Sequence, residues 1–406
     1  MNPTAATRNL FLLRQPTSSI LRPATTTIPR RTTTILPIQS RKMASSCSST
    51  SSSSSSPRPH FENIPSTQIR VLRSVPSLRR FRRPHLLDHR SVALVPTMGA
   101  LHEGHLSLIR AAARENHHVV VSIYVNPAQF GLAEDLDSYP QTWEADTRLL
   151  ADLDRELADD GSNLGRISAV FAPTTKEMYP SGFPGQEVDS RGSFVNITPV
   201  GEVLEGKTRP TFFRGVATVC MKLFNAVQPE RVYFGQKDVQ QTVVIKKMVR
   251  DFMLPVEVVV GKTVRGDDGL ALSSRNVYLG ERRKRVATVL FRALKAAEGV
   301  YLQEGKRKRE EILGAAEKVL KEVEEEQSAL GPRERVKFEV DYISLADPET
   351  MQELEGEVDV KKGGILSGAI KMLPVEEAKE GEDLGYGGGP AVRLIDNIIL
   401  EPEEKA

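Results

Sequence analysis

The chain has 406 residues, 39% of them apolar, which suffices for two ordinary globular domains. No apolar run approaches the roughly 18 residues of a membrane-spanning helix, so we expect no membrane partner. The net charge of +2 hides an asymmetry, because residues 1–61 hold eight Lys or Arg and no Asp or Glu. Residues 62–406 therefore carry 47 basic and 53 acidic side chains, a net charge of −6. This balance disfavours nucleic acid as a partner, since such binding needs a dense positive surface.

The first 61 residues differ in composition from the rest of the chain. They are rich in Ser, Thr, Pro and Arg, which predicts a disordered tail. The same composition is typical of a mitochondrial presequence, although a start at Met43 would remove most of it. We expect the cytosol, with the mitochondrial matrix as the alternative. Two cysteines, Cys47 and Cys220, are too few for a disulfide framework or a cysteine-based zinc site, which favours a reduced compartment.

Strand and helix patterns alternate after this tail. The first elements are expected to be a basic amphipathic helix, a strand, a helix and a second strand, at 69–83, 91–95, from about 104, and at 119–125. Pro96 and Gly99 are expected to end the first strand. The run at 119–125 is nearly continuous and β-branched, as in strands buried on both faces of a parallel sheet. The two strands and the helix between them form a βαβ unit with a right-handed crossover.

Further apolar runs extend this pattern. Expected strands lie at 169–172, 231–234 and 256–260, and expected helices at 216–227 and 239–252. The alternation predicts an α/β fold, a Rossmann-like doubly wound parallel sheet over residues 62–278.

The pattern changes after Tyr278. Charged helices are expected at 281–304 and 309–326, and short strands around 336–345 and 392–400. They predict a second, smaller α+β domain over residues 279–406. Two polar or Gly-rich stretches, 152–167 and 373–390, are expected to be surface insertions.

The segment PTMGALHEGH (96–105) joins the first strand to the helix that follows it. Ligands of doubly wound sheets bind at such a junction, and phosphates favour the positive end of a helix. Gly99 and Gly104 let the backbone approach a nucleotide closely, and His102 and His105 can donate hydrogen bonds to phosphate oxygens. Zinc is disfavoured, because a metalloprotease helix needs His at i and i+4, whereas these lie at i and i+3. A turn with two incidental histidines is the remaining alternative.

The His-x-Gly-His element on a first βα turn resembles the adenylyl-transferring enzymes that include class I aminoacyl-tRNA synthetases. Within that superfamily, the longer string is similar to the pantothenate synthetase family. Five more strings agree in order: VNPAQF (125–130), DLDSYPQT (135–142), RPTFFRGV (209–216), YFGQKDVQQ (233–241) and LSSRN (272–276). The resemblance spans about residues 66 to 400.

The resemblance implies a set of catalytic and ATP-binding residues. The catalytic set is His102, His105, Lys237, Ser273, Ser274 and Arg275. The remaining implied ATP contacts are Met98, Gly99, Gly235, Gln236, Asp238, Val264 and Leu272. Physically, Lys237 can neutralise phosphate charge and Asp238 can accept from ribose hydroxyls. Arg275 offers a fork of donors suited to pyrophosphate.

Pantoate carries a carboxylate and two hydroxyls, so its pocket needs neutral donors. The resemblance assigns this task to Gln129 and Gln241, and adds Asn126, Tyr139 and Glu205 to the pantoate and β-alanine pocket. It also suggests Asp146 near magnesium. One position departs from the family pattern, because Phe212 stands where members usually carry histidine, which puts the details of the carboxylate pocket in doubt.

The resemblance implies an ATP-dependent ligase that joins pantoate to β-alanine through a pantoyl adenylate. ATP enters with Mg²⁺, no tightly bound cofactor is expected, and a homodimer is implied. His105 is the expected proton-handling group of the second step, with a purely electrostatic role of this ring as the alternative. Two alternatives stay open: a related nucleotidyltransferase that stops at a nucleotidylated product, and a nucleotide-binding protein that has lost catalysis.

Overall fold

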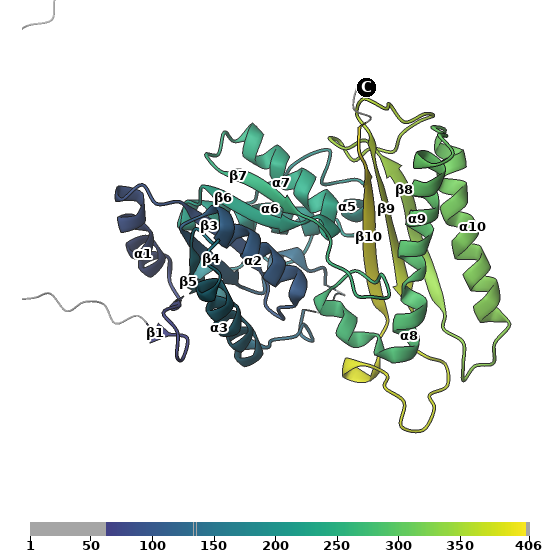
Figure 1. Cartoon of the computed structure of the whole chain (residues 1–406), viewed down its shortest axis with the longest axis horizontal. Helices are drawn as coiled ribbons and strands as arrows, with labels where there is room; N and C mark the ends of the chain where they lie inside the picture. The colour runs from purple at the N-terminus through teal and green to yellow at the C-terminus, as the bar shows by residue number, and fades with distance from the viewer. Residues whose placement is uncertain (1–61, 133, 135, 403–406) are drawn as a thin grey trace, which may run out of the picture. The chain divides into compact units, whose positions relative to one another are not determined.

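The computed structural model describes residues 62–132, 134 and 136–402. Within them, a seven-stranded sheet has the order β1-β2-β5-β4-β3-β6-β7, and all pairs except β1–β2 are parallel (Figure 1). The strands are β1 (Glu62–Asn63), β2 (Arg70–Leu72), β3 (Val92–Thr97), β4 (His118–Ile123), β5 (Arg166–Phe171), β6 (Arg231–Gly235) and β7 (Glu257–Gly261). This order confirms the predicted doubly wound α/β fold. The predictions for residues 1–61 lie outside the described residues.

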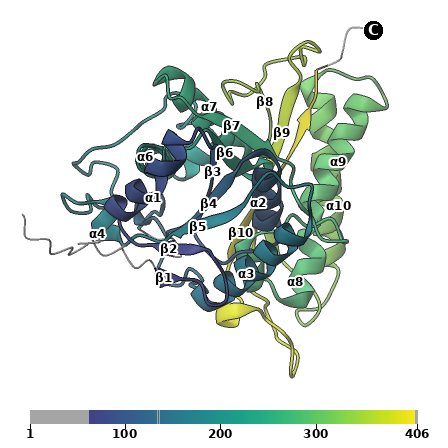
Figure 2. The same cartoon turned by 60° about the vertical axis from the view of Figure 1, so that its left-hand side comes forward.

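Helices cover both faces of this sheet, as Figure 2 shows. One face packs against α1 (Val75–Leu87), α6 (Phe212–Val227) and α7 (Val239–Asp251), and the other against α2 (Glu103–Glu115) and α3 (Trp143–Asp159). Alternate residues of β3 belong to the hydrophobic cores on opposite faces of the sheet. Leu94 lies in the core with α1, α6 and α7, and Val95 lies in the core with α2 and α3. A strand buried on both faces is apolar at nearly every position, which is why β3 and β4 form nearly continuous apolar runs.

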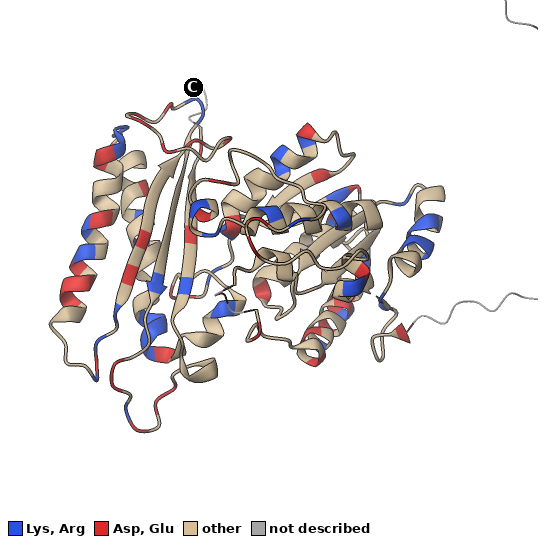
Figure 3. Cartoon of the chain, turned by 180° about the vertical axis from the view of Figure 1, so that it is seen from behind, with Lys and Arg blue, Asp and Glu red and all other residues tan. Residues whose placement is uncertain are grey.

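A separate antiparallel sheet lies in the C-terminal part, in the order β10-β9-β8. Its strands are β8 (Phe338–Ala346), β9 (Gly364–Met372) and β10 (Val392–Leu400), and α9 (Val289–Leu302) and α10 (Arg309–Ser328) pack on it through a third core. The helix α8 (Gly280–Ala287) precedes α9. Acidic and basic side chains alternate along α10, as expected for a solvent-facing helix (Figure 3). The exact domain boundary at 278/279 stays a prediction, because the described residues belong to one compact unit.

Several expected element bounds were wrong. The range 69–83 holds β2 and only then α1, because Ser74 caps the helix in a reciprocal capping box with Ser77. Residues 152–159, predicted as an insertion, belong to α3, whose apolar side is formed by Leu150, Leu153 and Leu157. The predicted helix 281–304 is two helices, and β9 was not predicted.

Pro96 does not end β3, which continues to Thr97. The carbonyl of Thr97 accepts from Tyr124 on the β4 side, so the backbone of Pro96 faces the opposite side. There the pairing with β6 covers only Ala93 and Leu94. The missing N–H of Pro96 therefore removes no ladder bond.

The remaining elements are short. They are α4 (Thr175–Met178), α5 (Glu205–Thr208), η1 (Pro127–Gln129), η2 (Gln236–Asp238), η3 (Ser274–Tyr278) and η4 (Tyr386–Gly388). Among the described residues, none of the helices is long and apolar enough to cross a membrane.

Candidate active site

The histidine loop, residues 98–105, connects β3 to α2 and is held by a buried carboxylate. Asp146, 1% exposed, accepts from the backbone N–H groups of Ala100 at 3.0 Å and Leu101 at 2.8 Å. Gly99 has a φ of +83°, and a Cβ on it would lie 3.0 Å from an Asp146 oxygen. The loop thus needs glycine here, both for its backbone angle and for the approach of this carboxylate.

The two histidines of this loop cap α2 with their own rings. The Nδ1 atom of His102 accepts from the N–H of Gly104 at 3.2 Å, and Nδ1 of His105 accepts from the N–H of His102 at 3.4 Å. A ring nitrogen that accepts carries no proton, so each neutral ring has its proton on Nε2. Both rings are therefore Nε2–H donors.

The rings are also held neutral. Burial, followed by the charge of Lys237, lowers the pKa of His102 to about 4. Burial, followed by His102 and then Lys237, lowers the pKa of His105 to about 3. The ring centroids lie 4.1 Å apart, so protonating one ring disfavours protonating the other.

Lys237 and Asp238 follow β6 in the short helix η2. The Lys237 ammonium lies 3.7 Å from the Asp238 carboxylate. From the C-terminal sheet, the Asn397 amide donates to the carbonyls of Gln236 at 2.9 Å and Lys237 at 2.8 Å, and its oxygen accepts from the Gln236 side chain at 3.3 Å. Asn397 is 2% exposed. Strand β10 thus fixes the backbone that carries the lysine.

The third element of the site is η3, which begins at Ser274. Ser273 caps it by accepting from the N–H of Arg275 at 3.2 Å. The Ser274 hydroxyl donates to the carbonyl of Ala100 at 3.0 Å, which joins η3 to the histidine loop. The Arg275 guanidinium lies 5.7 Å from the centroid of the Tyr139 ring.

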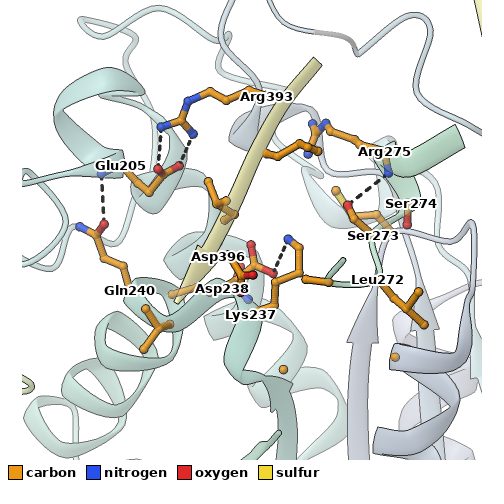
Figure 4. A pocket seen from close by; sticks show the side chains of 18 of the residues that line it. Glu205, Lys237, Asp238, Gln240, Leu272, Ser273, Ser274, Arg275, Arg393 and Asp396 are labelled. Atoms are coloured by element: carbon orange, nitrogen blue, oxygen red, sulfur yellow. Dashed lines mark hydrogen bonds and ion pairs between the residues drawn. The ribbon is translucent and has the colours of Figure 1, made fainter. Parts of the chain in front are cut away.

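These elements surround one cavity of about 750 Å³ at the carboxyl ends of the parallel strands. Figure 4 shows Lys237 and Asp238 between the Ser273–Arg275 turn on one side and a Glu205–Arg393 ion pair on the other. The predicted residues that line the cavity are Met98, His102, His105, Asn126, Gln129, Tyr139, Glu205, Gly235, Lys237, Asp238, Gln241, Val264, Leu272, Ser273, Ser274 and Arg275. Gly99, Gln236 and Asp146 lie behind this lining.

A hydrogen-bond chain orients the Gln129 amide. The Tyr179 hydroxyl donates to Oδ1 of Asn126 at 2.7 Å, and Nδ2 of Asn126 donates to Oε1 of Gln129 at 3.1 Å. The Nε2 group of Gln129 contacts the sulfur of Met98 at 3.1 Å. With its oxygen already used, Gln129 presents its NH₂ group, the donor that a carboxylate ligand needs.

Two predicted pocket residues have protein partners in this structure. Glu205 is bound by Arg393 from β10, and Asp146 is bound by the histidine loop. Among the described residues there is no group of three His, Cys, Asp or Glu side chains that would hold a metal ion. A magnesium contact of Asp146 stays a prediction, although its two oxygens already serve backbone N–H groups.

Phe212 is half-buried on the cavity wall. Its ring lies 3.8 Å below the guanidinium of Arg209, which pairs with Glu134 and donates to the carbonyl of Gln129 at 3.2 Å. An apolar ring therefore occupies this part of the wall, and Arg209 supplies the local positive charge.

Sequence reasoning missed the residues of β10 that reach the site. Asp396 pairs with Arg265 at 2.5 and 2.8 Å, and Asn397 holds η2. Both are buried. The available signal was an adjacent Asp and Asn in a strand that is apolar apart from these two residues and Arg393. Burying such polar groups costs free energy unless each has a partner.

The seven-stranded sheet and the cavity define an α/β protein whose candidate ligand site lies at the carboxyl ends of its parallel strands, on a His-x-Gly-His turn. Residues 70–399 match the family model described as Pantoate-beta-alanine ligase. The chain therefore belongs to the pantoate-beta-alanine ligase family.

Named relatives agree with this assignment. The chain is 44% identical over 330 residues to the pantothenate synthetase of Roseiflexus castenholzii, with 81% of this chain and 100% of the relative covered. It is 36% identical to the pantoate--beta-alanine ligase of Saccharomyces cerevisiae, with 82% and 100% covered.

Solved structures are similar as well. The crystal structure of pantothenate synthetase from Thermus thermophilus aligns with a TM-score of 0.64 and 38% identity, covering 82% of this chain and 100% of that one. A ligase from Francisella tularensis, complexed with beta-gamma ATP and beta-alanine, aligns with a TM-score of 0.56 and 28% identity, covering 82% and 97%.

Proposed function

We propose that this protein joins pantoate to β-alanine at the expense of ATP. A carboxylate oxygen of pantoate attacks the α-phosphorus, pyrophosphate leaves, and pantoyl adenylate remains bound. The amine of β-alanine then attacks the acyl carbon, the amine loses a proton, and AMP leaves. The observation that carries this proposal is the convergence of His105, Lys237 and Arg275, from three separate elements, on one cavity.

The cavity residues stabilise charge rather than form covalent intermediates. Two Nε2–H donors, from His102 and His105, lie at the start of α2, where the helix dipole also favours an anion. Lys237 and Arg275 add positive charge, and Ser273 and Ser274 add hydroxyls. Such groups accelerate phosphoryl chemistry by holding the reactants in line and by stabilising charge on the phosphate oxygens.

We propose that the proton of the β-alanine amine goes to an acceptor other than His105, because the Nδ1 of that ring is already engaged by a backbone N–H. Burial lowers the pKa of His105 to about 3, and its Nδ1 already accepts from a backbone N–H. We therefore assign this ring to hydrogen-bond donation, in place of the proton transfer expected from the sequence. The leaving phosphate, water and the Asp238 carboxylate on the cavity wall are candidate acceptors for that proton.

In this proposal, pantoate binds in the part of the cavity that is lined by Gln129 and Gln241. The F. tularensis structure is titled as a complex with beta-gamma ATP and beta-alanine, which supports ATP and β-alanine as substrates here. We further propose that Mg²⁺ arrives on the ATP phosphates and that the protein acts as a homodimer. Light scattering of the purified protein measures its oligomeric state, and a mass equal to that of one chain contradicts the homodimer.

For localisation we propose the cytosol, with the mitochondrial matrix as the alternative. The test compares fluorescent fusions with and without residues 1–42. Diffuse cytosolic signal from both forms supports the proposal, and a mitochondrial signal lost on truncation contradicts it.

The direct test of the function is isotope exchange between pyrophosphate and ATP. We expect exchange that requires pantoate, followed by AMP release that requires β-alanine. Lys237→Ala should lower exchange about a hundredfold or more, because a missing charge donor costs roughly 3 kcal/mol. Exchange that does not require pantoate contradicts the proposal. A stable nucleotidylated product, without AMP release that depends on β-alanine, favours a nucleotidyltransferase.

A further inference from the structure

The segment 373–390, predicted as a surface insertion, is tied to η3 by one buried arginine. Arg283, on α8, is 1% exposed. It donates to the carbonyls of Leu279 at 2.8 Å, Leu373 at 3.3 Å, Leu384 at 3.1 Å, Pro390 at 2.8 Å, and Tyr278. Leu373 and Pro390 are the two ends of the segment, and Tyr278 is the last residue of η3. A single guanidinium therefore joins the insertion at three points to the end of η3.

A second buried arginine anchors the tip of the segment. Arg282, 7% exposed, binds the Glu382 carboxylate at 2.5 and 2.6 Å and donates to the carbonyl of Glu377 at 3.0 Å. It also donates to the carbonyl of Arg333 at 2.6 Å. Most residues of the segment are exposed, as predicted for a surface insertion, but these two buried arginines tie its ends and its tip to the rest of the fold.

The segment also packs directly against η3. Gly385 has a φ of +88°, and a Cβ placed on it would lie 2.5 Å from both the carbonyl carbon and the oxygen of Tyr278. The Tyr386 ring lies 6.0 Å from the Tyr278 ring, centroid to centroid. The last residue of η3 is thus in backbone contact with the insertion.

Movement at this end of η3 reaches the active site, because η3 has only five residues. The N–H of Leu279 bonds to the carbonyl of Asn276 at 3.1 Å, and that of Asn276 to Ser273 at 3.0 Å. Arg275 lies one turn before Tyr278, on the cavity wall. Phosphate-binding groups lose most of their effect when they are displaced by about 1 Å.

We propose that the segment 373–390 is a brace that positions Ser274 and Arg275 through the end of η3. Arg283 and Gly385 are positioning residues, and they act on ATP through η3. This inference rests on the proposed contact of Arg275 with the ATP phosphates.

Two glycines of the same segment provide a matched test. Gly388 has a φ of +77°, close to that of Gly385, but a Cβ on it meets no atom within 4 Å. Gly385→Ala and Gly388→Ala therefore both place a Cβ on a residue with positive φ, and only the first presses on Tyr278. Gly385 also has a ψ of 173°, a region essentially restricted to glycine, so the melting temperature of each variant separates added backbone strain from the contact with Tyr278. The measurements are kcat and KM for ATP and for pantoate, with the melting temperature of each variant.

We expect Gly385→Ala to lower kcat/KM for ATP about tenfold, with KM for pantoate unchanged, and Gly388→Ala to stay within about twofold of wild type. Equal kinetics in the two variants would overturn the proposal. It would also be overturned if kcat/KM fell equally for ATP and pantoate in proportion to the fraction of folded protein. An inactive wild type refutes the proposed function instead, so the two failures are distinguishable.

A milder pair keeps the test valid if Gly385→Ala does not fold. Tyr386 is 61% exposed, so its replacement leaves the core intact. Tyr386→Ala removes the ring contact with Tyr278, and Tyr386→Phe retains it. We expect the first to lower kcat/KM for ATP about threefold and the second to keep the wild-type value, because the phenylalanine ring retains the aromatic contact with Tyr278. Identical kinetics for both would contradict the brace.

Discussion

Arg393 and Glu205 form a two-point ion pair that joins the C-terminal sheet to the wall of the active-site cavity. The two terminal guanidinium nitrogens of Arg393 each donate to one carboxylate oxygen of Glu205 at 2.7 Å, and Glu205 is only 5% exposed. The Tyr342 hydroxyl donates to the same carboxylate at 2.9 Å, and burial raises the pKa of that phenol. Arg393 also binds Asp341 at 2.6 and 2.8 Å. This network connects β8 and β10 to α5.

Removing Arg393 alone should lower the stability of the protein more than removing both Arg393 and Glu205. Arg393→Met leaves Glu205 buried without its counter-charge, so we expect the free energy of unfolding to fall by about 3–5 kcal/mol. The double variant Arg393→Met, Glu205→Leu should lose less than the single one. Urea denaturation measures both. A double variant less stable than the Arg393→Met single variant would contradict this account of the pair.

Asn397→Asp tests how β10 holds the lysine loop. The change replaces the amide donor to two backbone carbonyls with an acceptor, which leaves them opposite a buried oxygen. We expect a loss of about 2–3 kcal/mol in stability and a higher KM for ATP. Ser344→Ala is the control, since it removes a buried hydroxyl of the same sheet for which the described residues provide no partner. Equal effects of the two changes on KM would refute the link to Lys237.

Asp146→Asn separates positioning of the histidine loop from magnesium binding. One oxygen that serves Ala100 or Leu101 becomes an NH₂ group facing a backbone N–H. We expect a lower melting temperature and about a tenfold or greater fall in kcat, because His102 and His105 lose their alignment. Raising the magnesium concentration should not restore the rate. Full recovery at high magnesium would instead indicate that this carboxylate holds the metal.

The two histidines should resist protonation in the empty enzyme. Their pKa values, about 4 for His102 and about 3 for His105, lie below the ordinary 6.5, so the fold favours the neutral rings. As the pH falls from 6.5 toward 4, the unfolded chain takes up these protons first. The free energy of unfolding then drops by no more than about 1.4 kcal/mol per pH unit for each ring. Above pH 6.5 these rings contribute no slope.

NMR of the ring carbons measures this directly. Single His102→Asn and His105→Asn variants assign the two signals. We expect both signals to keep the neutral, Nε2-protonated shifts at pH 5.5, whereas exposed histidines titrate near 6.5. Titration of either ring between pH 6 and 7 would contradict the buried, backbone-bonded geometry.

The sequence alone determined the class of the sheet and the place of the candidate site. Runs such as 119–125 are apolar at nearly every position because both faces of β4 are covered, and that pattern is local and readable. The histidine loop was equally readable, since its glycines and histidines are contiguous. The predicted bounds of helices and strands were wrong where local signals compete. Ser74 starts α1 directly after a strand, and the polar residues on the exposed side of α3 resemble those of a loop.

Only the tertiary structure decided which partners the polar groups find. Asn397 lies 160 residues after Lys237, yet its amide holds the lysine's carbonyl, and Arg393 finds Glu205 across 188 residues. The anchoring of the surface segment 373–390 was not predictable, because its anchors, Arg282 and Arg283, lie about a hundred residues earlier. Buried polar groups must be satisfied, but nothing in local sequence states which distant residue satisfies them, because that choice is made by the packing of the two sheets.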